Sequence, residues 1–359
     1  MRKGLVFLLM LCFLSIAKAQ IPFQKGVNLT GWLQARNVSS IKFGNYSKKD
    51  FSDIKSLGCD VIRLPINLHG MTLGAPEYTI DPVFLSYLDS AISWAESLNL
   101  YLIIDNHSFN PSVSTSPEIE GILLKVWPQL AERYKNRSDF VIYEVLNEPH
   151  GIANDIWGKI QGKVIEAIRA KDKRHTIIVG PSGFNSYNDL AQMPIYSDPN
   201  LIYTFHFYDP FMFTHQGASW NTPSMVTLAN VPFPYVADRM PQCPPALKGS
   251  WMEQALKNYP KEGNVEFVKS LIDIAVMFRD KHKVDIFCGE FGVLMDNSID
   301  SERVYWYKIT REYLEGKSIP WTSWDYRGGF GIFTKGSQEQ FPSDLNIPLI
   351  KALGLTLPK

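Results

Sequence analysis

Short runs of β-branched and aromatic residues alternate with amphipathic helical patterns along most of this 359-residue sequence. The predicted strands are residues 24–29, 61–64, 100–104, 141–144, 176–179, 201–205, 285–289 and 321–324. Between them, apolar residues recur at helical spacing at 48–57, 82–98, 123–134, 156–170, 264–281 and 301–315. Repeated alternation of strand and helix predicts the α/β class and a single closed (β/α)8 barrel of parallel strands, a TIM barrel.

The connection after the sixth predicted strand is much longer than the others. It runs from about residue 209 to about residue 259 and is rich in proline and aromatic residues. A loop of this length inside a compact domain is usually functional. No composition break, repeat or low-complexity tract indicates a second module, so we predict one catalytic domain over residues 20–359.

The first 19 residues have the order of a secretory signal peptide. Arg2 and Lys3 precede an apolar run, and the small residues Ala17 and Ala19 stand just before Gln20. We therefore expect residues 1–19 to be removed and the protein to be secreted, to the periplasm or the cell exterior. The apolar run is short for a bilayer span, and no later stretch reaches about 18 apolar residues, so no membrane-spanning segment is expected.

Charge and cysteine content exclude several functional classes. Lys and Arg total 36, as do Asp and Glu, so no basic surplus is available to neutralise nucleic acid. A neutral ligand suits this balance, and we expect the protein to be a monomer. Beyond the signal segment, Cys59, Cys243 and Cys288 show no C-x-x-C spacing, so neither a zinc site nor a disulfide framework is predicted. Cys59 and Cys288 adjoin strands and are expected in the core, while one disulfide stays possible.

Polar residues follow most of the predicted strands. In a (β/α)8 barrel, catalytic residues gather at the carboxyl ends of the strands. Glu148 and Glu290 follow the fourth and seventh predicted strands, which can face each other across the barrel mouth. Two carboxylates so placed meet the requirement of glycoside hydrolysis, in which one protonates the leaving oxygen and the other attacks the anomeric carbon.

The neighbours of the two glutamates indicate different roles. Arg63 and Tyr208 can hold Glu290 ionised, because a cation and a hydrogen-bond donor both favour the carboxylate. Glu148 needs surroundings that raise its pKa, so that it carries a proton at working pH. Asn147 can offer its amide to the 2-hydroxyl of the sugar. We therefore predict Glu148 as acid/base and Glu290 as nucleophile.

These strand ends resemble those of glycoside hydrolase family 5, which contains endoglucanases, mannanases and relatives. The most specific segment is residues 141–150, VIYEVLNEPH, which is similar to the family signature around its acid/base. The positions usual in the family are present in order: Arg63, His107, Asn147, Glu148, His206, Tyr208, Glu290 and Trp324. The resemblance implies a retaining mechanism through a covalent glycosyl-enzyme on Glu290, with no cofactor or metal.

His107 and His206 are expected to recognise hydroxyl groups and to orient the acid/base. Two histidines near carboxylates can also indicate a metal site. Nothing in the sequence supplies the i, i+4 histidine pair or the cysteine set of a zinc site, so the substrate role is favoured.

Aromatic residues are the predicted sugar platforms. Trp324 is expected to lie beneath the sugar next to the scissile bond. The resemblance implies a cis peptide between Trp324 and Asp325. Trp32, Phe213 and Trp220 are expected to stack further sugars along a cleft.

The substrate itself is less constrained than the chemistry. A β-linked polysaccharide or oligosaccharide is expected, and the loop after Tyr208 resembles that of glucan-active members, which favours an endo-acting β-glucanase. A β-mannanase, an exo-β-1,3-glucanase and a β-glucosidase stay open, because the catalytic residues are common to all of them. A non-catalytic carbohydrate-binding protein would be indicated by loss of either glutamate, and both are present.

Overall fold

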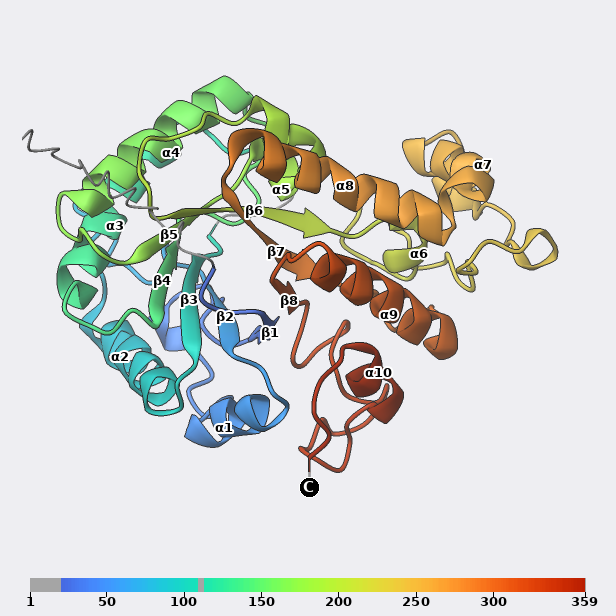
Figure 1. The fold of residues 1–359 in the computed structure, drawn as a ribbon, viewed down its shortest axis with the longest axis horizontal. Coiled ribbons are helices and arrows are strands. Elements are labelled where there is room, and N and C mark those ends of the chain that lie inside the picture. The colour runs from blue at the N-terminus through green and yellow to red at the C-terminus, as the bar shows by residue number, and fades with distance from the viewer. Residues whose placement is uncertain (1–20, 109–112, 359) are drawn as a thin grey trace, which may run out of the picture.

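The computed structural model describes residues 21–108 and 113–358, so the predicted signal peptide lies outside the described residues. Eight parallel strands form a closed barrel in sequence order (Figure 1). They are β1 (Lys25–Asn28), β2 (Val61–Ile66), β3 (Tyr101–Asn106), β4 (Val141–Glu144), β5 (Thr176–Val179), β6 (Leu201–Phe207), β7 (Asp285–Phe291) and β8 (Trp321–Ser323). The predicted (β/α)8 barrel is confirmed, and every predicted strand is present within two residues of its expected ends.

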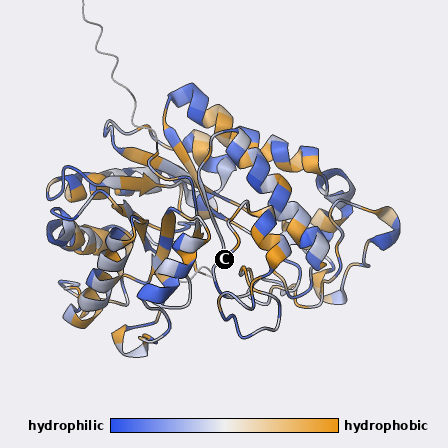
Figure 2. Cartoon of the chain, turned by 60° about the horizontal axis from the view of Figure 1, so that its bottom comes forward, coloured by the Kyte–Doolittle hydropathy of each residue, from blue (hydrophilic) through white to orange (hydrophobic). Residues whose placement is uncertain are grey.

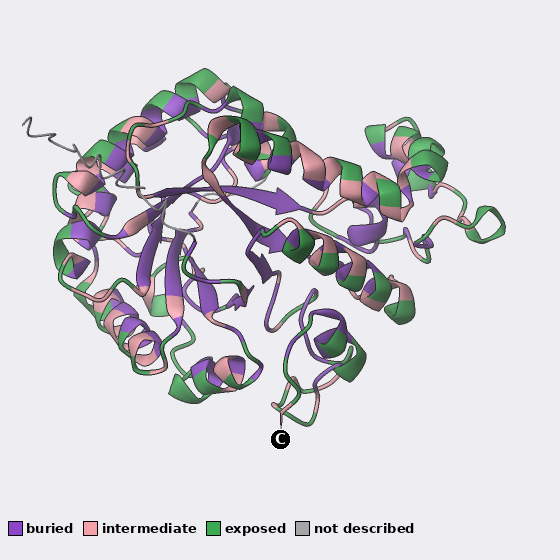
Figure 3. Ribbon diagram, in the orientation of Figure 1, coloured by how far each residue is buried: buried purple, intermediate pink, exposed green. Residues whose placement is uncertain are grey.

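Helices cover the outside of the barrel, with buried inner faces and exposed outer faces (Figure 3). The six predicted helices are α1 (Lys48–Ser56), α2 (Pro82–Ser97), α3 (Ile119–Tyr134), α4 (Asn154–Arg169), α8 (Val265–His282) and α9 (Asp300–Gly316). Helix α3 begins four residues before its predicted start, because Gly121, a weak helix former, obscures the pattern there. The fifth connection holds α5 (Ser182–Asn185) and η2 (Tyr187–Gln192), and α10 (Ile347–Ala352) lies near the carboxyl end.

Local sequence signals set several helix ends. Ser47 and Asp50 form a capping box at the start of α1, each side chain accepting from the backbone at the other end of the first turn. Asp81 caps α2, whose first residue is Pro82, a position where the missing N–H costs nothing. Asn264 caps α8 by accepting from the Phe267 amide. These caps agree with the predicted helix starts.

The long connection after β6 contains more regular structure than predicted. It includes α6 (Phe211–Thr214), η3 (Ala237–Arg239), η4 (Pro245–Leu247) and α7 (Trp251–Glu262). The expectation of an irregular loop was wrong for α7, where Ser250 caps the start and Met252, Leu256 and Tyr259 are buried on one face. Its proline and its short length hid the helical period.

Alternation along the strands divides the barrel interior into an apolar and a polar level. The apolar cluster inside the barrel comprises Ile21, Phe23, Val61, Ile103, Ile142, Ile178, Ile202 and Phe287. Two residues further along their strands, the same inward face carries Arg63, Asp105 and Glu144. The intervening residues point outward into the larger core between the strands and the helices. Hydrophobic residues accordingly run along the strands (Figure 2).

One irregularity of the barrel decides where Glu290 points. The pairing of β6 with β7 shifts, so that Phe205 pairs with Cys288 but His206 pairs with Glu290. The extra residue, Gly289, is a β-bulge. Phe287 faces the barrel interior and Cys288 the outer core, so an uninterrupted strand would turn Glu290 outward. The bulge returns Glu290 to the interior.

The cysteines lie mostly in the core. Cys59 and Cys288 are buried core residues, as predicted, and Cys243 is half-buried. All three are free thiols, so the disulfide that the sequence left possible does not form. None of the helices in the described part of the chain has the length and apolar character that a bilayer span requires.

Candidate active site

A buried guanidinium lies at the centre of the polar level. Arg63 binds Glu144 with two hydrogen bonds of 2.8 Å, and its Nη2 lies 3.1 Å from Asp105 Oδ2. Arg63 and Glu144 have almost no exposed surface, and burial raises the pKa of Glu144 although Arg63 opposes the shift. Glu144 is therefore a buried partner of Arg63. The third arm of the guanidinium reaches Glu290 and Asn28.

Glu290 is held from both sides by its predicted partners. Arg63 Nη1 donates to Oε1 at 2.7 Å, and the Tyr208 hydroxyl donates to Oε2 at 2.8 Å. Burial nevertheless raises the pKa of Glu290, as does the neighbouring Glu148, while Arg63 and His206 act to lower it. Both predicted contacts are present, and Arg63 acts on the pKa of Glu290 in the expected direction, toward the carboxylate.

Glu148 occupies a more open position in the loop after β4. Its backbone adopts a φ of 45°, which is uncommon for a residue with a Cβ, and 23% of its side chain is exposed. Burial raises its pKa to about 6, with His107 and Arg63 opposing the shift. A carboxyl group of this kind keeps its proton to a higher pH than an ordinary glutamate does. The raised pKa predicted for the acid/base is confirmed in direction.

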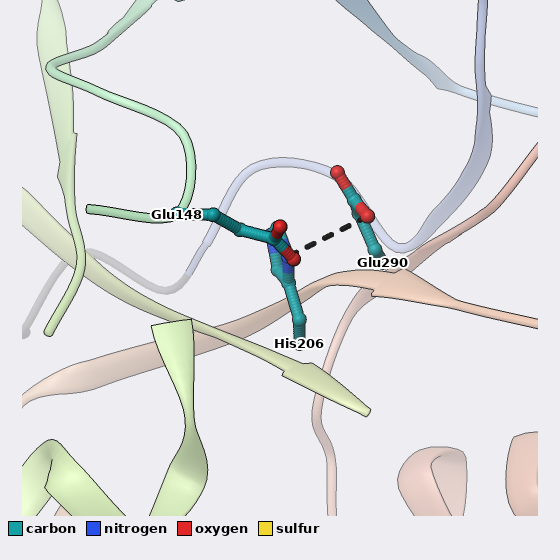
Figure 4. A group of neighbouring side chains, drawn as sticks. All are labelled: Glu148, His206 and Glu290. Atoms are coloured by element: carbon teal, nitrogen blue, oxygen red, sulfur yellow. Dashed lines mark hydrogen bonds and ion pairs between the residues drawn. The ribbon is translucent and has the colours of Figure 1, made fainter. Parts of the chain in front are cut away.

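His206, on β6, links the two glutamates. Its Nδ1 lies 2.7 Å from Glu148 Oε1 and 3.5 Å from Glu290 Oε2. One nitrogen or oxygen of each of these three residues lies within 4.8 Å of the others. In Figure 4 the two glutamates approach each other from opposite sides, and His206 reaches the same point from another direction. The barrel therefore brings together two carboxylates that are 142 positions apart in the chain.

His107 connects the arginine cluster to the predicted sugar platform. Its Nδ1 lies 2.8 Å from Asp105 Oδ2, and its Nε2 lies 3.2 Å from the Asn147 amide nitrogen. Burial lowers the pKa of His107. In its neutral form the ring can donate to Asp105 from Nδ1 and accept from Asn147 at Nε2. The ring also stacks on Trp324, with centroids 5.5 Å apart and an interplanar angle of 18°.

The aromatic predictions divide into surface and core residues. Trp324 is half-buried and is followed by a cis peptide to Asp325, as the resemblance implied. Trp220 is 53% exposed, and its ring lies near those of His215 and Phe330. Trp32 is only 1% exposed and Phe213 is fully buried, so the prediction that they stack sugars was wrong.

Both of the aromatic residues whose role was wrongly predicted are covered by other aromatic side chains. Trp32 stacks on Trp94 of α2, with centroids 6.2 Å apart and planes within 5°. Phe213 packs against Phe233, whose ring centroid is 5.2 Å away. An aromatic residue in a loop carries no sequence signal of what will cover it.

Sequence reasoning missed two asparagines of the site. Asn28, at the end of β1, accepts from Arg63 Nη1 at 2.9 Å and donates to the Gly289 carbonyl oxygen at 3.0 Å. Asn185 follows β5 and lies beside His206. Asn28 ends its strand as the other site residues do, so the same rule would have found it. Asn185 is six residues beyond its strand and had no such signal.

Comparisons with known proteins agree with this geometry. A family model described as "Cellulase (glycosyl hydrolase family 5)" matches residues 22–329. Endoglucanase 3 of Fibrobacter succinogenes is 30% identical over 350 residues, which cover 89% of this chain and 52% of that protein. Endoglucanase C of Acetivibrio thermocellus is 29% identical over 330 residues, covering 86% of this chain and 92% of its own. This chain therefore spans about half of the first relative and nearly all of the second.

A solved endoglucanase structure is also similar to this chain. The crystal structure of endoglucanase Cel5A from the hyperthermophilic Thermotoga maritima superposes with a TM-score of 0.77 at 25% identity. The superposition covers 92% of this chain and 96% of that chain.

Proposed function

This chain belongs to glycosyl hydrolase family 5, and from that membership and the geometry of its site we propose that it is an endo-acting β-glucanase. In the proposed reaction, water cleaves a β-linked glucan and the anomeric configuration is retained. The observation that carries the proposal is the pair of carboxylates, Glu148 and Glu290, at the carboxyl ends of β4 and β7.

The separation of the pair supports the retaining course. Oxygens of the two carboxylates lie within 4.8 Å of each other. Retaining enzymes place their carboxyl groups about 5–5.5 Å apart, whereas inverting enzymes need about 6.5–9.5 Å to hold a water molecule. The gap is too short for a water to attack from the far side of the sugar.

In the first proposed step, Glu148 protonates the glycosidic oxygen while Glu290 attacks the anomeric carbon. The bond from that carbon to the leaving oxygen breaks, and an ester to Glu290 forms. In the second step, ionised Glu148 takes a proton from water, the water oxygen attacks the anomeric carbon, and Glu290 leaves as a carboxylate. Arg63 and Tyr208, which contact the two Glu290 oxygens, stabilise the carboxylate that leaves.

Two further side chains are proposed to hold the sugar. Asn147 uses one N–H for His107 and its carbonyl oxygen for Arg63, which leaves a second N–H for the 2-hydroxyl. Trp324 offers the face of its indole to a pyranose ring. Trp220 is proposed as a platform for a sugar further along the chain.

The glucan preference rests on the relatives, which carry the name endoglucanase. Another structure of the Thermotoga protein is described as a complex with mannotriose substrate, so β-mannan belongs in the substrate panel. We also propose that the enzyme is exported through its amino-terminal segment and acts as a monomer, without a metal or cofactor.

The test is release of reducing ends from soluble β-1,4-glucan, β-1,3-glucan, mixed-linkage glucan, xyloglucan and β-mannan. Wild type is compared with Glu290→Ala, and with Glu118→Ala as a control for loss of an exposed carboxylate. We expect cleavage of β-1,4-linked glucan and a loss of at least about three decades for Glu290→Ala, roughly 4 kcal/mol of barrier. Absence of cleavage of any polymer by wild type would refute the proposal.

Sodium azide then separates the two carboxylate roles. Azide attacking in place of the nucleophile in Glu290→Ala gives an α-glycosyl azide. In Glu148→Ala it gives a β-glycosyl azide, because the glycosyl-enzyme forms first. The reverse pattern would exchange the two assignments.

A further inference from the structure

The turn after β5 lies directly against His206, the histidine that contacts Glu148. In this turn Gly183, Phe184 and Asn185 have φ values of 73°, 62° and 53°. Such left-handed backbone is unfavourable for residues with a Cβ, although asparagine tolerates it better than most. The next residue, Ser186, forms a parallel β-bridge with His206. The turn therefore brings Asn185 beside the imidazole that contacts both glutamates.

Asn185 is fully buried, and its amide nitrogen lies 3.5 Å from His206 Nε2. Two glycines make room for this arrangement. A Cβ on Gly180 would lie 2.6 Å from Asn185 Oδ1, and a Cβ on Gly289 would lie 3.1 Å from His206 Nε2. The space around Nε2 is thus shaped for the asparagine amide.

The chemistry of the amide selects one tautomer of the histidine. Burial lowers the pKa of His206 to about 4, so the ring is neutral and carries one proton. The asparagine NH2 group can only donate and is the part of the amide that faces Nε2, so this contact favours Nε2 as the acceptor. The proton then sits on Nδ1 and is donated to Glu148 Oε1, 2.7 Å away. The charged or titratable groups around this ring are Glu148, Glu290, Arg63, Glu144 and His107.

We propose that Asn185 is a positioning residue that fixes His206 in the Nδ1–H tautomer and thereby reserves Glu148 Oε2 for proton transfer to the leaving oxygen. The inference rests on the acid/base role proposed for Glu148. With the opposite tautomer, the Nδ1 lone pair would accept the proton of the carboxylic acid and draw it away from the substrate. The Nδ1–H tautomer serves both steps, since it donates to Glu148 whether that residue is protonated or ionised.

The decisive variant is Asn185→Asp. Aspartate keeps the size and tolerates the left-handed backbone, but it replaces the donor toward Nε2 by an acceptor and so favours Nε2–H. Asn185→Gly keeps the backbone conformation and removes the amide. Asn99→Asp is the matched control, because Asn99 also has a left-handed φ, of 50°, but is exposed in the turn before β3.

The readout is kcat/KM on aryl β-cellobiosides with good and poor leaving groups, because only poor ones depend on proton donation. For Asn185→Asp we expect a loss of about tenfold or more on the poor leaving group and less than about threefold on the good one. Its basic pH limb should move to higher pH, since Glu148 loses a donor that favours its ionised form. Asn185→Gly should show the same selectivity, more weakly, and Asn99→Asp should match wild type.

An equal loss on both substrates, or an unmoved pH limb, would reduce Asn185 to a packing residue and overturn the proposal. Nitrogen-15 NMR showing the wild-type His206 proton on Nε2 would do the same. If Asn185→Asp does not fold, the glycine variant carries the test. Glu148→Gln separates the two hypotheses. If this variant keeps its activity on the poor leaving group, the acid/base assignment of Glu148 fails. If Glu148→Gln loses that activity and the Asn185 variants keep it, only the role of Asn185 fails.

Discussion

Arg63 is the residue on which the charges of the site converge. It contacts the carboxylates of Asp105, Glu144 and Glu290 and is itself fully buried. Buried charges of this kind are tolerated only when they are paired and hydrogen-bonded. The arrangement leaves two carboxylates as structural partners of the cation and directs the remaining arm of the guanidinium at Glu290. A single cation thereby orients the proposed nucleophile.

The raised pKa of Glu148 leads to a prediction about pH. The acid must be protonated in the first step, so kcat/KM on soluble glucan should fall as pH rises through about 6, the pKa of this group. An unperturbed glutamate would give a fall nearer its ordinary value of 4.5. The measurement is a kcat/KM profile from pH 3 to about 9, beside an activated aryl glycoside that needs no acid. A basic limb of equal size on both substrates would argue against Glu148 as its origin.

At the scale of elements, the bulge in β7 couples the sheet to the site. Gly289 is the extra residue, and its carbonyl oxygen accepts from Asn28 Nδ2 and from the Thr322 hydroxyl at 2.6 Å. These hydrogen bonds satisfy the carbonyl group at the bulge. The same bulge turns Glu290 toward the barrel interior. Secondary structure and catalytic geometry therefore depend on one glycine.

We predict that Gly289→Ala damages both stability and activity. Its Cβ would lie 2.8 Å from Thr204 Oγ1 and 3.1 Å from His206 Nε2, so one of these side chains must move. Overpacking of this kind costs about 1–3 kcal/mol, measured as the free energy of unfolding in urea. Displacement of His206 should also lower kcat on glucan. Gly121→Ala is the control: its Cβ would meet nothing within 4 Å in α3, and it should stabilise the fold by about 0.5–1 kcal/mol. Wild-type activity in Gly289→Ala would contradict this account of the bulge.

At the scale of the whole molecule, barrel closure and packing hold the fold together, and the three cysteines of the described residues form no disulfide. β1 pairs with both β2 and β8, which leaves no open edge to the sheet. One apolar cluster fills the lower interior of the barrel, and a larger one lies between the strands and the helices. Stability comes from this burial and from the continuous ladder of backbone hydrogen bonds.

The free thiols allow a test of whether the fold is stable without a disulfide. Cys59, Cys243 and Cys288 are unpaired, so the thermal midpoint should be the same with and without a reducing agent. Cys59 and Cys288 are buried, and burial raises the pKa of the Cys59 thiol to about 12, so iodoacetamide should label them only after unfolding. Mass spectrometry of native and urea-treated protein reads this directly. A midpoint that drops on reduction would show that a disulfide forms.

The linear pattern of the chain was enough to predict the architecture and most of the site. Strand-forming runs and amphipathic helices alternate visibly, and polar residues at the carboxyl ends of parallel strands must meet at one mouth. That rule brings Glu148, Glu290, Arg63, Tyr208 and the two histidines to the mouth, and the family resemblance selects the same residues. Period and composition are properties of short segments, so they can be recognised without knowing what surrounds them.

Packing between distant segments decided the rest. Trp32 and Phe213 are in the core because other aromatic residues cover them. The residues next to them in the sequence do not indicate that contact. The bulge that turns Glu290 inward arises from pairing between β6 and β7, and the place of Asn185 arises from a left-handed turn pressed against β6. Burial likewise raises the pKa of Glu290, and the depth at which a strand end is buried is set by the packing around it. Each of these depends on neighbours far apart in the chain, which only folding brings into contact.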